Sequence, residues 1–142
     1  MWQNSTNYFQ VMTIKTLLAP KTIYYWAAQL WTLFIVILCL MDGSSFPHVS
    51  VKGADKYVHF SLHFVFAFLW LMYFLKKGTA SKRATVWVFF GSLFLGIALE
   101  FCQAFFTTTR KADVFDVLFN TLGAITALSA TQMGIYFSKQ TR

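Results

Sequence analysis

The chain has 142 residues, of which 57% are hydrophobic and only 12% are charged, and its mean hydropathy is +0.54. Soluble domains usually contain about 25% charged and about 45–50% apolar residues, so this composition predicts an integral membrane protein. The formal net charge of +7 does not indicate a nucleic-acid-binding protein, because the basic residues lie at the ends of apolar segments and not in a patch on a soluble scaffold.

The apolar residues are gathered into four long segments that follow one another along the chain. The first segment contains twenty residues without a charge, which is enough to span a hydrocarbon core of about 30 Å. The other three contain few charges and are separated by short polar or basic connections. The predicted spans are Thr22–Met41, Asp55–Leu75, Ala84–Phe106 and Asp113–Phe137. This pattern predicts an all-α fold, in which four transmembrane helices form one bundle over residues 22–137.

Short segments flank this domain, and their charges predict its orientation. Residues 1–21 form either an N-terminal tail or an interfacial helix, and residues 138–142 form a C-terminal tail. Eight Lys and Arg residues lie on the side of the two termini, and four lie on the other side. By the positive-inside rule, we expect both termini in the cytoplasm. All five acidic residues then lie in the outer half of the bundle, and Glu100 lies inside an apolar segment, where a topology signal does not explain it.

Polar side chains gather at the predicted outer ends of the last three segments. Most of them are spaced three or four residues apart within their segment, so they share a helix face. The residues are Asp55, Lys56 and His59 in the second segment, Glu100 and Gln103 in the third, and Asp113, Asp116 and Asn120 in the fourth. Threading four helices through a membrane brings these side chains to a similar depth. The sequence therefore predicts a polar cup near the outer surface, with Glu100 offset by a basic side chain or by His59.

Three short motifs carry a family resemblance. They are Asp55-Lys56-x-x-His59-Phe60, Glu100-x-x-Gln103, and Arg110-x-x-Asp113-x-x-Asp116-x-x-x-Asn120-x-x-Gly123. In their order, spacing and helix placement, the chain resembles the VanZ-like family of bacterial membrane proteins over roughly residues 22–137. Two positions depart from that pattern, since His63 stands where an aromatic residue is common and Thr126-Ala127 where a further glycine is common. The resemblance implies a multi-pass protein of the bacterial cytoplasmic membrane, linked to resistance to the lipoglycopeptide teicoplanin.

The first functional hypothesis is a site for a lipid or for a lipid-linked anionic headgroup, which the outward-facing cup binds or processes. Arg110, Lys56 and the N-termini of the second and fourth helices would supply positive potential. The candidate ligand-binding residues are Asp55, Lys56, Gln103, Arg110, Asp113 and Asn120. The expected partners are membrane lipids or lipid-linked envelope intermediates, and no nucleic acid.

The second hypothesis is an enzyme whose candidate catalytic residues are His59, Glu100 and Asp116, unless these only bind. His59 would act as a general acid or base, oriented by Asp55 or Asp116, with Glu100 as a second carboxylate. In a variant of this hypothesis, Asp, His and Glu side chains hold a divalent metal. The sequence contains neither an HExxH motif nor a serine elbow, so it recovers no named catalytic class, assigns no metal ligand and leaves the cofactor open.

Two further alternatives remain open at this stage. In the first, the polar set only locks the helix bundle, and the protein is a structural or interaction protein. In the second, more remote alternative, the chain is a proton-coupled transporter, although four helices without a repeat make a small transport unit. The sequence does not decide whether the protein is an enzyme.

Overall fold

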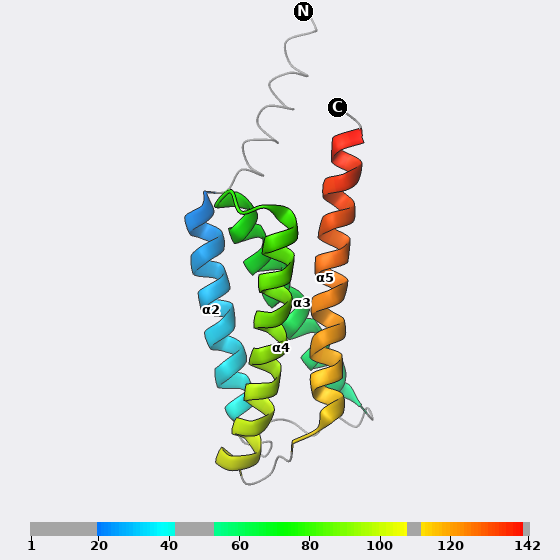
Figure 1. Ribbon diagram of the computed structural model, residues 1–142. Coiled ribbons are helices and arrows are strands. Elements are labelled where there is room, and N and C mark those ends of the chain that lie inside the picture. Colours follow the sequence, from blue (N-terminus) through cyan, green and yellow to red (C-terminus); the bar gives the residue numbers. More distant parts are fainter. Residues whose placement is uncertain (1–19, 42–52, 108–111, 141–142) are drawn as a thin grey trace, which may run out of the picture.

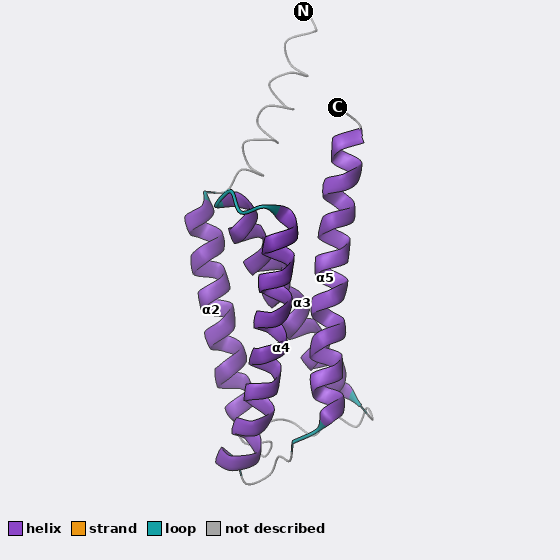
Figure 2. Cartoon of the chain, viewed as in Figure 1, coloured by secondary structure: helices purple, strands orange, loops and turns teal. Residues whose placement is uncertain are grey.

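The computed structural model describes residues 20–41, 53–107 and 112–140 of the chain. Its elements are α2 (Lys21–Leu40), α3 (Ala54–Lys76), α4 (Ser81–Phe106) and α5 (Val114–Gln140), arranged side by side as a bundle (Figure 1). Within these described ranges the chain contains helices and connecting loops but no strand (Figure 2). Each of the four helices is long and apolar enough to cross a membrane. The predicted all-α fold with four spans is therefore confirmed, whereas the orientation of the termini stays a prediction.

Two helices are longer than the predicted spans, because they continue into charged and polar residues. The helix α4 begins at Ser81, three residues before the predicted start at Ala84, and α5 continues to Gln140, beyond Phe137. At these ends the predicted spans stop close to the first charged residues. Long basic side chains at a helix end can nevertheless reach the membrane interface while the backbone stays helical. Lys139 also lies in the last turn of α5, where a cation complements the helix dipole.

The helix α3 packs against each of the other three helices, and its largest interface is with α5. A Cβ atom at Gly123 of α5 would meet the main-chain carbonyl oxygen of Phe60 of α3, so the absence of a side chain there permits the close approach. Gly96 of α4 faces Asn120 of α5 at a similarly tight position, where an added Cβ would lie 3.1 Å from the Asn120 Nδ2 atom. These two glycines set the spacing of the helices that carry the polar residues.

Two groups of buried apolar side chains fill the bundle interior, and large apolar side chains cover its outside. One group joins α3, α4 and α5, and the other joins α2, α3 and α4. Many of the largest exposed side chains, such as Phe94, Phe105 and Phe106, are aromatic, as expected for helices that contact lipid. The buried side chains of His59, Glu100 and Asp116 lie at the end of the bundle where α3 and α5 begin and α4 ends. This is the lower end in Figure 1.

Candidate functional site

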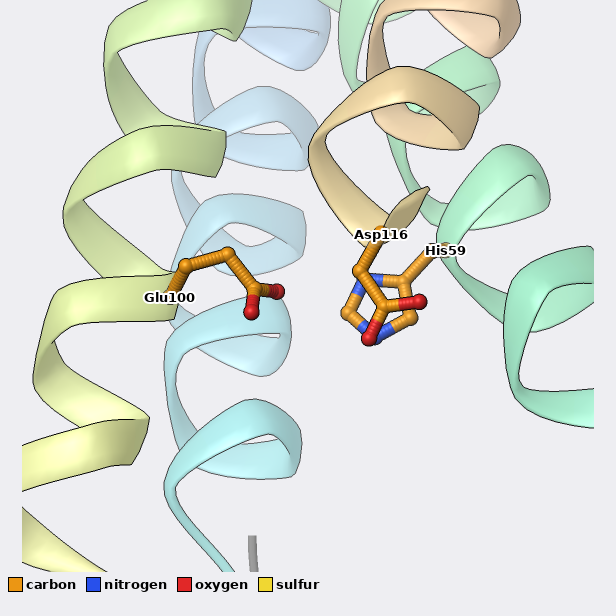
Figure 3. Close-up of side chains that lie close together, drawn as sticks. All are labelled: His59, Glu100 and Asp116. Carbon is orange, nitrogen blue, oxygen red and sulfur yellow. The ribbon is translucent and has the colours of Figure 1, made fainter. Parts of the chain in front are cut away.

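Three helices bring three ionisable side chains together at this end of the bundle. His59 comes from α3, Glu100 from α4 and Asp116 from α5, and all three are buried. One ligand atom from each residue lies within 4.8 Å of those from the other two. Figure 3 shows the Glu100 carboxylate extending from α4 toward the His59 ring and the Asp116 carboxylate. We refer to these three residues as the buried cluster.

The start of α5 fixes the position of Asp116. The Phe115 main-chain N–H donates a hydrogen bond of 2.8 Å to Asp113 Oδ1, so Asp113 acts as the N-cap of this helix. Asp116 follows within the first turn and is thereby directed toward α3. The helix α3 begins one residue after Gly53, whose φ of 80° is favourable for glycine and lets the chain turn into the helix.

Lys56 joins α3 to the start of α5 through ion pairs. Its Nζ atom lies 2.8 Å from Asp113 Oδ2, 3.0 Å from Asp116 Oδ1 and 3.4 Å from Asp55 Oδ2. Hydrogen bonding to Lys56 and then to the Phe115 N–H lowers the pKa of the Asp113 carboxyl. Lys56 is therefore shared among three carboxylates, which leaves it less able to bind a further anion.

Within the part of the chain that the structure describes, Glu100 is hydrogen-bonded through one of its two carboxylate oxygens. Its Oε2 atom accepts a hydrogen bond of 2.9 Å from the main-chain N–H of Asp113. Its Oε1 atom is buried and has no hydrogen-bond partner among the described residues, although the residue is only 4% exposed. The sequence predicted a basic side chain or His59 as the partner of Glu100, and not a main-chain donor. A buried carboxylate oxygen without a partner is costly, so this atom requires an explanation.

Asn120 orients the His59 ring. The Nδ1 atom of His59 lies 3.2 Å from the Asn120 Oδ1 atom, and an amide oxygen can only accept a hydrogen bond. The Nδ1 atom therefore donates in this contact, and the Nε2 atom faces the Asp116 Oδ2 atom, 3.5 Å away. Of the two carboxylates expected to orient His59, it is Asp116 that faces the ring.

The remaining predicted site residues lie at or beyond the edge of the buried cluster. Asp55 has an exposed side chain and pairs with Lys56 at the rim. Gln103 is buried, but its Nε2 atom donates a hydrogen bond of 2.9 Å to the carbonyl oxygen of Cys39, which ties α4 to α2. Arg110 lies outside the described residues. One turn further along α3 than His59, and deeper in the bundle, the His63 Nδ1 atom lies 2.7 Å from the Ser92 Oγ atom, which links α3 to α4.

The fold and this site together define a class, that of multi-pass helical membrane proteins with buried acidic and histidine side chains at one end of the bundle. The family model described as VanZ/LLP1 matches residues 2–135, which is nearly the whole sequence. The chain belongs to the VanZ/LLP1 family. The match also includes the N-terminal residues that the sequence resemblance, placed at about 22–137, did not include.

A relative and a search of solved structures complete the comparison. The chain is 36% identical over 98 residues to an uncharacterized protein of the fission yeast Schizosaccharomyces pombe. The alignment covers 68% of this chain and 58% of the yeast protein, so the chain spans less than two thirds of that relative's length. No solved structure matches the chain.

Proposed function

We propose that this protein binds the anionic headgroup of a membrane lipid, or of a lipid-linked envelope intermediate, at the polar end of the bundle. The observation that carries the proposal is the position of the buried cluster, at one end of four helices of membrane-spanning length. Ionisable groups at this depth lie close to lipid headgroups, and ionisable residues within membrane segments usually serve a function. A ligand that is itself a lipid can reach such a site without leaving the membrane.

The charges of the described residues define what an anionic ligand would need. Glu100, Asp113 and Asp116 are carboxylates, and Lys56 is the ammonium group that neutralises part of their charge. Binding an anion therefore requires additional positive charge. Arg110 is the candidate within the third sequence motif, and a bound cation is a second source. If the headgroup is also processed, His59 is the candidate general acid or base.

The orientation and cellular setting belong to the same proposal. The excess of Lys and Arg on the side of the termini supports an outward-facing site. In a bacterial cytoplasmic membrane, this site would lie in the leaflet that a lipoglycopeptide reaches through its lipid tail. Altered surface lipids would then connect the protein to teicoplanin resistance. The relative in a fission yeast favours a ligand shared by bacteria and eukaryotes, and the phosphate of a glycerophospholipid meets this requirement.

A structural role is the second candidate, and one observation favours it. The ion pairs of Lys56 and the hydrogen bond from Asp113 to Glu100 connect α3, α4 and α5. Such contacts between membrane helices contribute about 0.6 kcal/mol each on average. In this case the polar set would serve only to lock the bundle.

Retention of lipid and thermal stability in detergent separate the two candidates. The full chain is purified in a mild detergent and analysed by native mass spectrometry for bound anionic phospholipid. We expect lipid on the parent, and loss of most of it from His59→Ala, Glu100→Gln and Asp116→Asn, with melting temperatures at or above the parent's. Gln132→Leu, at the opposite end of the bundle, should retain the lipid.

Two outcomes would contradict the proposed function. If the three variants retain as much anionic lipid as the parent, the buried cluster does not bind the headgroup. If all three lose most of their folded yield, the polar set locks the bundle and the structural candidate is correct.

A further inference from the structure

We propose that His59, Glu100 and Asp116 bind one divalent metal ion. Their candidate ligand atoms come from three helices, are buried, and lie within 4.8 Å of one another. In a tetrahedral site, nitrogen and oxygen ligands at about 2.0–2.2 Å from one ion lie roughly 3.5 Å from one another, so side-chain movements of about 1 Å would close the site around an ion. This inference goes beyond headgroup binding, because the cation site does not depend on which lipid the protein binds.

The Oε1 atom of Glu100 supplies an independent argument for a ligand. Glu100 is 96% buried, as its 4% exposure shows, and this oxygen has no partner in the part of the chain that the structure describes. Figure 3 shows the Glu100 carboxylate, to which this oxygen belongs, directed toward His59 and Asp116. A buried carboxylate is stable when it is paired or coordinates a metal. A cation at the centre of the buried cluster satisfies this oxygen.

One polar atom of each proposed ligand contacts a different supporting group. His59 Nδ1 contacts Asn120 Oδ1 at 3.2 Å. Glu100 Oε2 accepts the main-chain N–H of Asp113 at 2.9 Å. Asp116 Oδ1 accepts from Lys56 at 3.0 Å.

In each side chain a further atom remains as a candidate metal ligand. The Nε2 atom of His59 lies 3.5 Å from Oδ2 of Asp116, and Oε1 of Glu100 has no partner among the described residues. Supporting hydrogen bonds of this kind orient metal ligands and fix the histidine tautomer. A set of side chains that served only to lock helices gains nothing from a buried Glu100 Oε1 atom that has no partner among the described residues.

The local charge also fits a divalent cation. With the acidic side chains ionised, as metal binding requires, Glu100, Asp113 and Asp116 contribute three negative charges, and Lys56 contributes one positive charge. Leaving aside the exposed Asp55, the described groups have a surplus of two negative charges, which one divalent ion neutralises. A bound ion would also provide the positive charge that an anionic headgroup requires.

The ligand chemistry narrows the choice of metal. One imidazole nitrogen with two carboxylate oxygens suits Mn²⁺ or Zn²⁺ better than Ca²⁺ or Mg²⁺, which prefer oxygen ligands alone. Three protein ligands leave at least one coordination position for water or for an oxygen of a bound molecule, which is the arrangement of catalytic rather than structural zinc sites.

Electron paramagnetic resonance with Mn²⁺ tests the proposal on the full chain in detergent. The protein is stripped with a chelator, titrated with MnCl₂, and examined by pulsed methods for coupling between Mn²⁺ and a ¹⁴N nucleus. We expect one bound Mn²⁺ per chain with histidine nitrogen coupling. Glu100→Gln and Asp116→Asn should weaken the affinity by at least about tenfold, and His59→Ala should abolish the nitrogen coupling.

Matched controls exclude indirect effects on this readout. His63→Gln removes the neighbouring buried histidine, whose Nδ1 atom bonds to Ser92, and should keep the nitrogen coupling. Gln132→Leu alters a polar contact at the opposite end of the bundle and should keep the parent's affinity. Helicity and monodispersity of each variant establish that it is folded.

Failure of the cation site is distinguishable from failure of the headgroup proposal. Absence of Mn²⁺ binding by the parent, binding without ¹⁴N coupling, or equal affinity in Glu100→Gln and the parent would overturn the cation site. The titration is repeated with a short-chain phosphatidic acid. A metal that binds with nitrogen coupling but does not alter lipid binding supports the cation site and contradicts only a metal-assisted headgroup site.

Discussion

Two polar clusters lie between α4 and α5, one at each end of the bundle, and they are built on different principles. At the end where α4 begins, the Ser81 hydroxyl donates to Gln132 Oε1 at 2.7 Å, and Gln132 Nε2 donates to Thr85 Oγ1 at 2.8 Å. These groups are neutral, and both ends of the Gln132 amide are bonded. At the other end, Glu100 and Asp116 are carboxylates beside His59, and the Glu100 Oε1 atom lacks a partner within the described ranges.

The difference indicates which cluster exists for stability alone. A neutral hydrogen-bonded set is sufficient to join two membrane helices, as the Gln132 cluster demonstrates. Ionised side chains add an insertion cost, which reaches about 2.5–3.5 kcal/mol at the membrane centre on insertion scales and decreases toward its surface. A chain that needed only to fasten its helices would have no reason to use carboxylates at one end and an amide at the other. The charged cluster is therefore better explained as a binding site.

The largest expected effect is a stabilisation by metal that only the charged end can provide. At a free Mn²⁺ concentration of 100 times the dissociation constant, a single site should stabilise the parent by about 2.7 kcal/mol. We expect Glu100→Gln, with affinity at least about tenfold weaker, to lose about half of this gain or more. Without metal it should melt at or above the parent, since a buried carboxyl with one unpartnered oxygen is removed. Thermal unfolding in detergent over a series of Mn²⁺ concentrations measures both effects. An equal metal-induced shift in the parent and in Glu100→Gln would show that the ion binds elsewhere.

A smaller loss should follow when the neutral end is broken. Gln132→Leu removes two hydrogen bonds between α4 and α5, and at about 0.6 kcal/mol each the variant should lose roughly 1 kcal/mol of stability. Its response to Mn²⁺ should equal that of the parent, because the change lies at the opposite end of both helices. Denaturation of the two proteins in the same detergent gives the comparison. If Gln132→Leu responded to Mn²⁺ less than the parent does, the conclusion that the neutral cluster only joins the helices and the charged cluster binds the ion would be wrong.

The sequence was sufficient to predict the fold and most of the buried cluster. Long uncharged segments predicted the four helices, because a lipid environment leaves few other ways to satisfy the backbone. The spacing of Asp113, Asp116 and Asn120 predicted one shared face. In the structure, Asn120 contacts the Nδ1 atom of the His59 ring and Asp116 contacts its Nε2 atom. These are regularities of a helix, which periodicity reveals directly.

The partners of individual polar groups could not be predicted in the same way. Gln103 and Asn120 are both buried amides of the predicted site, yet Asn120 contacts His59 whereas Gln103 bonds to the Cys39 carbonyl. Cys39 lies in the last turn of α2, where carbonyl groups have no partner within the helix. Likewise, Glu100 bonds to the main-chain N–H of Asp113, which depends on the course of the connection into α5. Both contacts follow from the positions of helix ends, which sequence patterns define least well.

The smallest expected effect is a change of thermal stability at low pH, which should occur at the charged end of the bundle and not at the neutral end. Hydrogen bonding to Lys56 lowers the pKa of Asp113 below its ordinary value of 3.8, so its ionised form is favoured in the folded protein. The stability from this pairing is present above that ordinary value and is lost as the pH falls through and below it. Asp113→Asn removes the charge but keeps an N-cap side chain for the Phe115 N–H, because Asn is as effective a cap as Asp. In metal-free protein, the parent should therefore melt slightly above Asp113→Asn at neutral pH, and the two melting temperatures should converge in acid.

The difference in melting temperature between the parent and Gln132→Leu should stay constant over the same pH range, since the Gln132 cluster contains no titrating group. A gap between the parent and Asp113→Asn that does not change with pH would mean that the Lys56 pairing contributes nothing to the stability of this end.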